Sequence, residues 1–188
     1  MTGIILSGGK NLRMGTNKAF IEVDGERLID RTVKLFKDIF KEVILVTNSP
    51  LEYLDQDVKI VTDIIKGKGA LGGIYTGLFY SNYDYSFFSA CDMPFLNKNF
   101  IEHMIANIGH HDIVVPESTD GLQPLHAIYS GKCLNHIKKL IDKDKLKITG
   151  FYDRFKTFKI PDNTIKSFDP EGKMFFNVNS KEDLKKIS

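Results

Sequence analysis

The segment that decides the fold is residues 3–18, which read GIILSGGKNLRMGTNK. Its first four residues form a short apolar run rich in β-branched side chains, the pattern of a buried β-strand. The run ends in Ser7-Gly8-Gly9, where glycines permit the tight turn that leads out of a strand. We therefore expect a buried strand near the start of the chain, followed directly by a glycine-rich loop.

Strand and helix patterns alternate after this segment. Apolar residues recur at helical spacing over residues 28–40, and a continuous apolar strand follows at 42–47. A strand near 58–61, a helix at about 71–79 and a strand at 85–90 repeat the scheme. This order predicts an α/β protein with a Rossmann-like, three-layer fold, right-handed crossovers and a mostly parallel sheet.

The second half of the chain continues the pattern with one change of direction. A helix through Phe100, Met104 and Ile108 precedes a strand at 113–115, residues 116–124 read as a loop, and we expect the strand at 127–129 to be antiparallel. Ser180, with Asp183 three positions later, predicts the N-cap of a last helix. The 188 residues suit one domain, which we expect to span 1–188.

The composition of the chain indicates which classes of partner and which cellular compartment to expect. The 26 basic and 24 acidic residues are spread along the chain, so its net charge of +2 gives no reason to expect nucleic acid as a partner. No segment approaches the ~20 apolar residues of a membrane span, and the opening residues lack the basic region of a secretory signal. The two cysteines fit reduced cytosolic thiols. We expect a cytoplasmic protein without a membrane partner.

The loop after the first strand has the chemistry of a phosphate site. Glycines without a Cβ let backbone N–H groups approach phosphate oxygens, and Arg13 and Lys18 supply positive charge. The spacing matches neither a Walker A loop nor the Gly-x-Gly-x-x-Gly dinucleotide fingerprint. The alternative is a tight strand-to-helix turn that binds nothing; the glycines alone do not decide against it, but the added basic residues do.

Two aspartates follow predicted strands. Asp92 lies at the end of the apolar run 87–90, where a carboxylate has little reason to sit unless water, a metal or a cation reaches it. A single carboxylate together with substrate phosphates suffices to hold Mg²⁺. Asp63 also ends a strand, and the carboxyl ends of parallel strands form the usual ligand crevice of such folds. The alternatives are a turn before Pro94 for Asp92 and an N-cap or turn for Asp63.

Three further features bear on function. Five glycines between positions 67 and 77, including Gly73, indicate close approach of a ligand or, at Gly67 and Gly69, a simple turn before a helix. The five histidines have no metal-ligand spacing, so we expect them at the surface or in hydrogen bonds. Cys91 has no evident activating partner and is expected to be a buried structural thiol.

Leu-x-Gly-Gly, followed by Arg-Met-Gly and a lysine, resembles the signature of the molybdenum cofactor guanylyltransferases, part of a larger superfamily of α/β nucleotidylyltransferases. The resemblance covers nearly the whole chain. Besides the opening motif, it extends to Val61-Thr62-Asp63, Gly69-Ala70-Leu71-Gly72-Gly73-Ile74, Cys91-Asp92-Met93-Pro94 and Phe176-Asn177-Val178-Asn179.

The resemblance implies transfer of GMP from GTP to the phosphate of molybdopterin, with Mg²⁺ as cofactor, in a single nucleotidylyltransferase domain. It leaves open molybdoenzymes or cofactor-delivery proteins as protein partners. The catalytic residues it implies are Lys18, Arg13 and Asp92, with Asp92 as the metal ligand. The nucleotide contacts it implies are Leu6, Ser7, Gly8, Gly9, Lys18, Asp63, Gly73 and Asp92, and the acceptor contacts are Asn177 and Asn179.

The chain departs from the family pattern at three positions, which bear on the identity of the acceptor substrate more than on membership of the superfamily. Ser7 replaces the usual alanine, Leu12 stands where a second basic residue is common, and Ala70 replaces the usual proline. A cytidylyltransferase for molybdopterin, a sugar-phosphate nucleotidylyltransferase and a non-catalytic nucleotide-binding regulator remain alternatives. Retention of both Lys18 and Asp92 favours an enzyme, because a pure binder has less need of a metal at the α-phosphate.

Overall fold

The first strand, β1 (Thr2–Ser7), lies between β4 (Glu42–Thr47) and β6 (Tyr85–Ala90) in the computed structural model and runs parallel to both. The structure describes residues 1–8, 17–23, 25–178 and 183. Leu6 pairs with Ala90 and Ser7 with Thr47, so the three strands end side by side. This alignment brings the segments that follow β1, β4 and β6 to one edge of the sheet.

Within the described residues the main sheet has eight strands. Across the sheet they are β10 (Thr157–Pro161), β7 (Ile113–Ser118), β9 (His126–Ser130), β6, β1, β4 and β5 (Lys59–Val61), with β8 (Gly121–Leu122) paired to β7 alone. β9 is antiparallel to both of its neighbours, whereas the β10–β7, β6–β1, β1–β4 and β4–β5 pairs are parallel. The predicted α/β class, the mostly parallel sheet and its antiparallel strand are confirmed.

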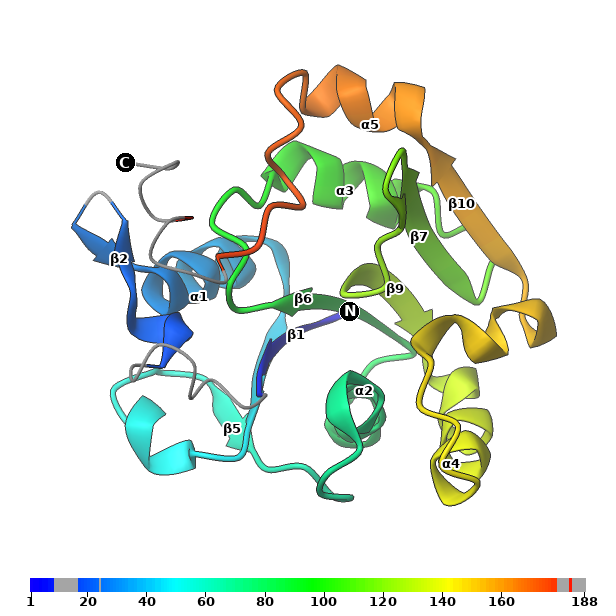
Figure 1. Ribbon diagram of the computed structural model, residues 1–188, viewed down its shortest axis with the longest axis horizontal. Helices are drawn as coiled ribbons and strands as arrows, with labels where there is room; N and C mark the ends of the chain where they lie inside the picture. Colours follow the sequence, from blue (N-terminus) through cyan, green and yellow to red (C-terminus); the bar gives the residue numbers. More distant parts are fainter. Residues whose placement is uncertain (9–16, 24, 179–182, 184–188) are drawn as a thin grey trace.

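Helices cover both faces of the sheet and complete the predicted three layers (Figure 1). One face carries α1 (Leu28–Ile39), α3 (Lys98–Ala106) and α5 (Asp162–Phe168), and the other carries α2 (Gly69–Tyr80) and α4 (Leu134–Asp142). The short elements are a β2–β3 hairpin (Glu22–Val23 and Glu26–Arg27) and the 3₁₀ helices η2 (Lys18–Phe20), η3 (Pro50–Tyr53), η4 (Gly131–Cys133) and η5 (Ile148–Arg154). None of the described helices is long and apolar enough to traverse a lipid bilayer.

The central strands are apolar throughout because the helices bury both of their faces. Successive side chains of a strand point to opposite sides. In β1, Ile5 joins the core under α1 and α3, while Ile4 joins the core under α2 and α4. Phe87 and Phe88 of β6 divide in the same way. Continuous apolar runs are therefore the correct sequence signal for these strands.

Glycines let α2 lie close against the sheet. A Cβ at Gly77 would stand 2.7 Å from atoms of both Ile4 and Phe88, and one at Gly73 would stand 3.1 Å from Leu6. Both contacts lie between α2 and the core strands. Packing against the sheet thus explains Gly73 and Gly77, while Gly67 and Gly69 adopt positive φ values of +75° and +56° at the turn that leads into α2. A nucleotide contact at Gly73 stays a prediction.

Two predicted elements differ from the structure. The segment 116–124, expected to be a loop, continues β7 to Ser118 and returns as β8, because Gly121 adopts a φ of +103° at the turn and Glu117 pairs with Leu122. The third helix ends at Ala106 rather than reaching Ile108, since Asn107 caps it. The predicted N-cap at Ser180 lies outside the described residues.

His126 was expected at the surface or in a hydrogen bond, and this expectation is wrong. The residue is fully buried at the start of β9, and neither ring nitrogen has a hydrogen-bond partner. Its ring lies among those of Phe87, Phe100 and Phe175, with centroids 5.0 to 5.8 Å away. The sequence predicts a strand only at 127–129, which excludes His126. In the structure β9 begins at His126, which pairs with Ser89 of β6 and so lies in the core.

Burial lowers the pKa of His126 to about 3, so the protein should lose stability in mild acid. Below the unfolded-state pKa near 6.5 the unfolded chain takes up a proton that the folded chain does not. This linkage costs about 1.4 kcal/mol of unfolding free energy per pH unit until the folded pKa is reached. His126→Leu removes the group, so its advantage over the wild type in denaturant unfolding should grow as the pH falls from 7 to 4. If the unfolding free energies of the two proteins changed with pH in parallel, the lowered pKa of His126 would be contradicted.

Candidate active site

Lys18 and Asp92 meet where β1 and β6 end. The Lys18 Nζ lies 3.7 Å from the Asp92 Oδ2, and the two side chains are 15% and 20% exposed. Lys18 opens η2, and Asp92 follows β6 by two residues. The ends of β1 and β6 are joined at this edge because the Cys91 N–H donates to the Leu6 carbonyl at 3.0 Å. A partly buried cation and a partly buried carboxylate thus lie together at this edge of the sheet.

Asp92 is an unfavourable residue for the fold. Burial raises the pKa of its carboxyl group above the usual value, and the Lys18 ammonium only partly opposes that shift. The neighbouring Cys91 is almost fully buried, and burial raises the pKa of its thiol to about 12. Cys91 is therefore protonated at neutral pH and is no nucleophile, as expected for a structural thiol. Both cysteines of the chain are free.

The two residues that begin the glycine-rich loop have different environments. Ser7 is buried, and its side-chain hydroxyl hydrogen-bonds the Tyr53 hydroxyl in the interior. Gly8 is exposed, and a Cβ there would have nothing within 4 Å, which leaves its backbone accessible. Gly9 and Arg13, both predicted to contact phosphates, lie outside the described residues.

Asp63 lies at the same edge, beyond β5, which is separated from β1 by one strand. Its Oδ2 accepts a hydrogen bond from the Asn48 side chain at 2.7 Å, and Asn48 follows β4. The strand order therefore sets Asp63 apart from Lys18 and Asp92, on the far side of the segment that follows β4. Leu6, at the end of β1, is half-buried under α2 beside Gly73.

The segment before the carboxyl terminus crosses the site. The Val178 N–H donates to the Asp92 carbonyl at 2.9 Å, and Val178 is buried against Val23 and Leu28. Asn177 is exposed next to this anchor. The structure thus brings one of the two predicted acceptor residues to the site, whereas Asn179 lies outside the described residues.

The donor set fits one divalent ion of the magnesium type. Among the described residues no three histidine, cysteine or acidic side chains converge, which disfavours a closed all-protein metal site. A single partly exposed carboxylate fits Mg²⁺, because this ion keeps most of its waters and takes its other ligands from phosphates. Asp92 is the residue that would hold it.

Tyr53 is a site residue that the sequence analysis missed. Its ring is fully buried at the end of η3, and its hydroxyl reaches both Ser7 and Asn17. Nothing in its local sequence distinguishes it, because its partners lie 46 and 36 positions away. The pattern that would have found it is the pairing of β1 with β4, which brings the segment after β4 to the loop.

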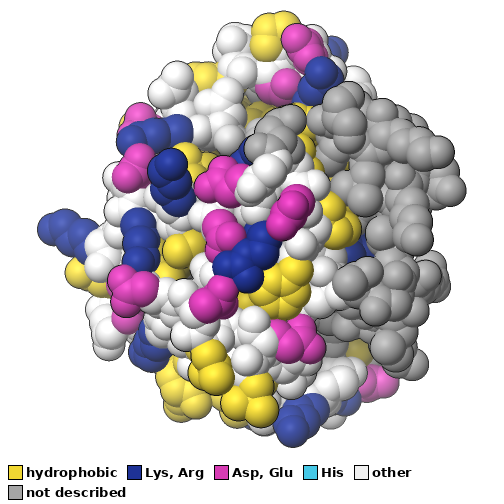
Figure 2. Space-filling view, turned by 90° about the vertical axis from the view of Figure 1, so that its left-hand side faces the viewer, with side chains coloured by type: hydrophobic (Ala, Val, Ile, Leu, Met, Phe, Trp, Pro, Cys, Tyr) yellow, Lys and Arg dark blue, Asp and Glu magenta, His cyan; other side chains and the backbone are white. Residues whose placement is uncertain are grey.

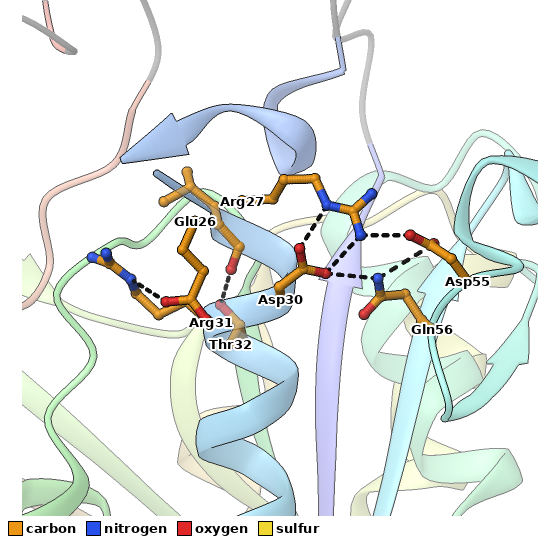
Figure 3. A network of polar contacts seen from close by, with 8 residues as sticks. Glu26, Arg27, Asp30, Arg31, Thr32, Asp55 and Gln56 are labelled. Carbon is orange, nitrogen blue, oxygen red and sulfur yellow. Dashed lines mark hydrogen bonds and ion pairs between the residues drawn. The ribbon is translucent and has the colours of Figure 1, made fainter. Parts of the chain in front are cut away.

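A polar network holds the segment after η3 against α1 (Figure 3). Arg27 donates to both carboxylate oxygens of Asp30 and also reaches Asp55, and the Gln56 side chain donates to both aspartates. The hydrogen bonds with Asp30 and Asp55 raise the pKa of Arg27. A bidentate arginine–carboxylate network of this kind contributes more to folding stability than an isolated surface ion pair does.

Basic and acidic side chains alternate over the described part of the face that carries α1 and β5. Figure 2 shows the two kinds next to one another there. Lys37 pairs with Asp57, for example, and Arg27 pairs with Asp55. Attraction of an anionic ligand on this side therefore depends on local groups such as Lys18.

Comparison with known proteins decides the family. A family model described as the MobA-like NTP transferase domain matches residues 3–154. The chain is 38% identical to the molybdenum cofactor guanylyltransferase of Desulfosudis oleivorans over 99% of its own length and 93% of the relative's. It is 35% identical to a probable molybdenum cofactor guanylyltransferase of Peptoclostridium acidaminophilum, over 100% and 88% of the two chains. The chain belongs to the molybdenum cofactor guanylyltransferase family.

A solved structure agrees with this membership. The crystal structure of molybdopterin-guanine dinucleotide biosynthesis protein A from Archaeoglobus fulgidus superposes with a TM-score of 0.85 at 26% identity, over 100% of this chain and 96% of that one. The resemblance inferred from the sequence motifs is confirmed.

Asp92→Asn should separate stability from activity. Since the folded-state pKa of Asp92 is raised, the ionised carboxylate costs stability above that pKa, and the neutral amide should give an equal or higher melting temperature at pH 7 to 8. The advantage should vanish as the pH falls and the wild-type carboxyl group takes up its proton. Turnover should fall on the order of a hundred- to a thousandfold.

Asp30, a carboxylate whose pKa is lowered rather than raised by the fold, is the control for this experiment. Hydrogen bonds from Arg27 lower the pKa of Asp30, so Asp30→Asn should lower the melting temperature at neutral pH. A destabilised Asp92→Asn variant with near-normal turnover would show that Asp92 is a structural residue.

Proposed function

We propose that the protein transfers GMP from GTP to the phosphate of molybdopterin, forming molybdopterin guanine dinucleotide and pyrophosphate. An oxygen of the acceptor phosphate forms a bond to the α-phosphorus while the bond from that phosphorus to the pyrophosphate oxygen breaks. The observation that carries the proposal is the Lys18–Asp92 pair at the joined ends of β1 and β6. Full-length similarity to guanylyltransferases of this cofactor supports both the donor and the acceptor.

The main barrier to this reaction is repulsion between two anions. The acceptor phosphate is already ionised at neutral pH, so no proton has to be removed before it attacks. Catalysis then depends on holding the two phosphates together and neutralising charge as it develops on the leaving pyrophosphate. Lys18 would contact the donor phosphates, and Arg13, on the glycine-rich loop, would add a second positive charge. The part-burial of Lys18 strengthens its contact, since less water screens it.

We also propose that Asp92 holds Mg²⁺ at the donor phosphates. When bound, the ion would neutralise phosphate charge and act as a Lewis acid at the α-phosphate. Asp92 can serve because its carboxylate is in contact with a lysine yet still reaches solvent. Lys18 would then exchange part of its interaction with Asp92 for the phosphates. The exposed Gly8 backbone and Asp63 would bind other parts of the nucleotide.

A cytoplasmic location and delivery of the product to molybdoenzymes or cofactor-delivery proteins complete the proposal. The two free, buried cysteines support a reducing compartment.

Nucleotide preference and the role of Lys18 can be tested in one assay. The purified protein with Mg²⁺ and molybdopterin should release pyrophosphate with GTP and transfer the α-phosphate label to the pterin, with CTP a poorer donor. Lys18→Ala should lower the rate on the order of a hundred- to a thousandfold, because its contact strengthens in the transition state. Lys138→Ala, which removes an exposed i,i+4 pair with Asp142 on α4, is the matched control and should leave the rate unchanged.

Preference for CTP would assign the protein to the cytidylyl branch, and transfer to a sugar phosphate instead of the pterin would replace the acceptor. Tight GTP binding without any product would favour the non-catalytic regulator.

The carboxyl-terminal asparagines should affect the acceptor alone. Replacing Asn177 and Asn179 together by alanine should raise the KM for molybdopterin several-fold while GTP affinity and melting temperature stay near those of the wild type. Asn97→Ala is the structural comparison, because Asn97 caps α3 through the Phe100 N–H and its loss should cost ~1 kcal/mol of stability. A lower melting temperature with an unchanged acceptor KM in the double variant would make Asn177 and Asn179 structural as well.

A further inference from the structure

A chain of three neutral side chains lies beside the Lys18–Asp92 pair. The Asn17 amide donates to the Tyr53 hydroxyl at 2.8 Å, and that hydroxyl shares a 2.5 Å hydrogen bond with Ser7. The Cys91 N–H donates to the carbonyl of Leu6, the residue before Ser7, at 3.0 Å. Asn17 precedes Lys18 and Cys91 precedes Asp92, so the side-chain bonds and this backbone bond connect the residues immediately before the two charged ones.

Tyr53 also connects the two ends of the glycine-rich loop. Ser7 is the last residue of β1, before the loop, and Asn17 follows it. The Asn17 Oδ1 accepts a hydrogen bond from the Ala19 N–H at 3.2 Å and so caps η2, the element that Lys18 opens. Fixing the Asn17 amide therefore fixes the backbone from which Lys18 extends.

The position of Tyr53 is set by contacts that do not involve the loop. Its ring packs on Phe20 with centroids 4.9 Å apart, and the Arg27 guanidinium lies 5.5 Å from the centroid of the Phe20 ring. Its carbonyl accepts from the Gln56 N–H at 2.9 Å, and Gln56 belongs to the Arg27–Asp30 network of Figure 3. The hydroxyl is thus held on a frame anchored to α1.

The buried hydroxyl depends on its hydrogen bonds. A phenol oxygen taken from water costs free energy unless it is hydrogen-bonded, and the bonds to Ser7 and Asn17 offset that cost. Burial raises the pKa of Tyr53, so the hydroxyl keeps its proton at neutral pH and can both donate and accept. Its two partners are the residues that flank the loop, which is the position a catalytic loop needs to have fixed.

We propose that Tyr53 is a positioning residue for nucleotidyl transfer: its hydroxyl holds Asn17 and Ser7 so that Lys18 and Asp92 face the same phosphates. The inference rests on the proposed function for its kinetic consequence and on the structure alone for its effect on the Lys18–Asp92 contact. Tyr53 does not touch the substrate and acts through Asn17 and Ser7.

Tyr53→Phe tests the proposal, with Tyr152→Phe as the matched control. Tyr152 is also a buried tyrosine, and it shares a 2.5 Å hydrogen bond with the Tyr129 hydroxyl, which keeps a second bond to the Pro124 carbonyl. Both variants lose one buried hydroxyl and should lose similar stability. Only Tyr53→Phe should lower kcat for guanylyl transfer, on the order of ten- to a hundredfold, with the KM for GTP within about threefold of the wild type.

A second measurement needs no substrate. Amide hydrogen exchange of Ala19 is measured by NMR in the wild type and in both variants. Because the Ala19 N–H donates to the Asn17 Oδ1, looser placement of Asn17 in Tyr53→Phe should speed that exchange, whereas Tyr152→Phe should leave it unchanged. An unchanged Ala19 exchange rate in Tyr53→Phe, or a kcat equal to that of Tyr152→Phe, would overturn the positioning role. Absence of transfer by the wild-type protein would instead refute the proposed function, and the exchange rate would still decide the role of Tyr53.

Discussion

The parallel pairing of β1 with β4 and β6 is the constraint on which the rest of the molecule depends. It places the carboxyl ends of three strands side by side, so the loop after β1, the segment with Tyr53 after β4 and the turn with Asp92 after β6 meet at one edge. The pairing is fixed from both faces, because Ile4 and Ile5 enter different cores. A shift by one residue would exchange these faces, so the register of the site is set by the packing of the core.

The site carries costs that the packed core has to offset. Asp92 is held where its charged form is disfavoured. It lies next to Lys18, at the end of β6. A residue that costs stability is characteristic of a functional site, since activity and stability make different demands on the same atoms. His126 also costs stability, but its ring lies in an aromatic cluster in the core under α1 and α3.

The sequence predicts more of the fold than of the candidate site. Apolar runs predicted β1, β4 and β6 because those strands are buried on both faces, and a carboxylate directly after such a run predicted Asp92. The β7–β8 turn was missed because its residues read equally well as a loop. Tyr53 was missed for a different reason: its role comes from hydrogen bonds to residues 36 and 46 positions away, which no local pattern encodes. Gly73 has a packing reason that a sequence motif cannot distinguish from ligand contact.

The central claim is that the phosphates of GTP bind between Lys18 and Asp92 at the joined ends of β1 and β6. A crystal structure of the protein with Mg²⁺ and a non-hydrolysable GTP analogue tests it most directly. The account predicts that the Lys18 ammonium contacts the triphosphate, that the Asp92 carboxylate ligates the cation on the same phosphates, and that the Tyr53 hydroxyl keeps its hydrogen bonds to Ser7 and Asn17. A triphosphate bound at another edge of the sheet, with Lys18 still paired to Asp92 and no cation on that carboxylate, would contradict it.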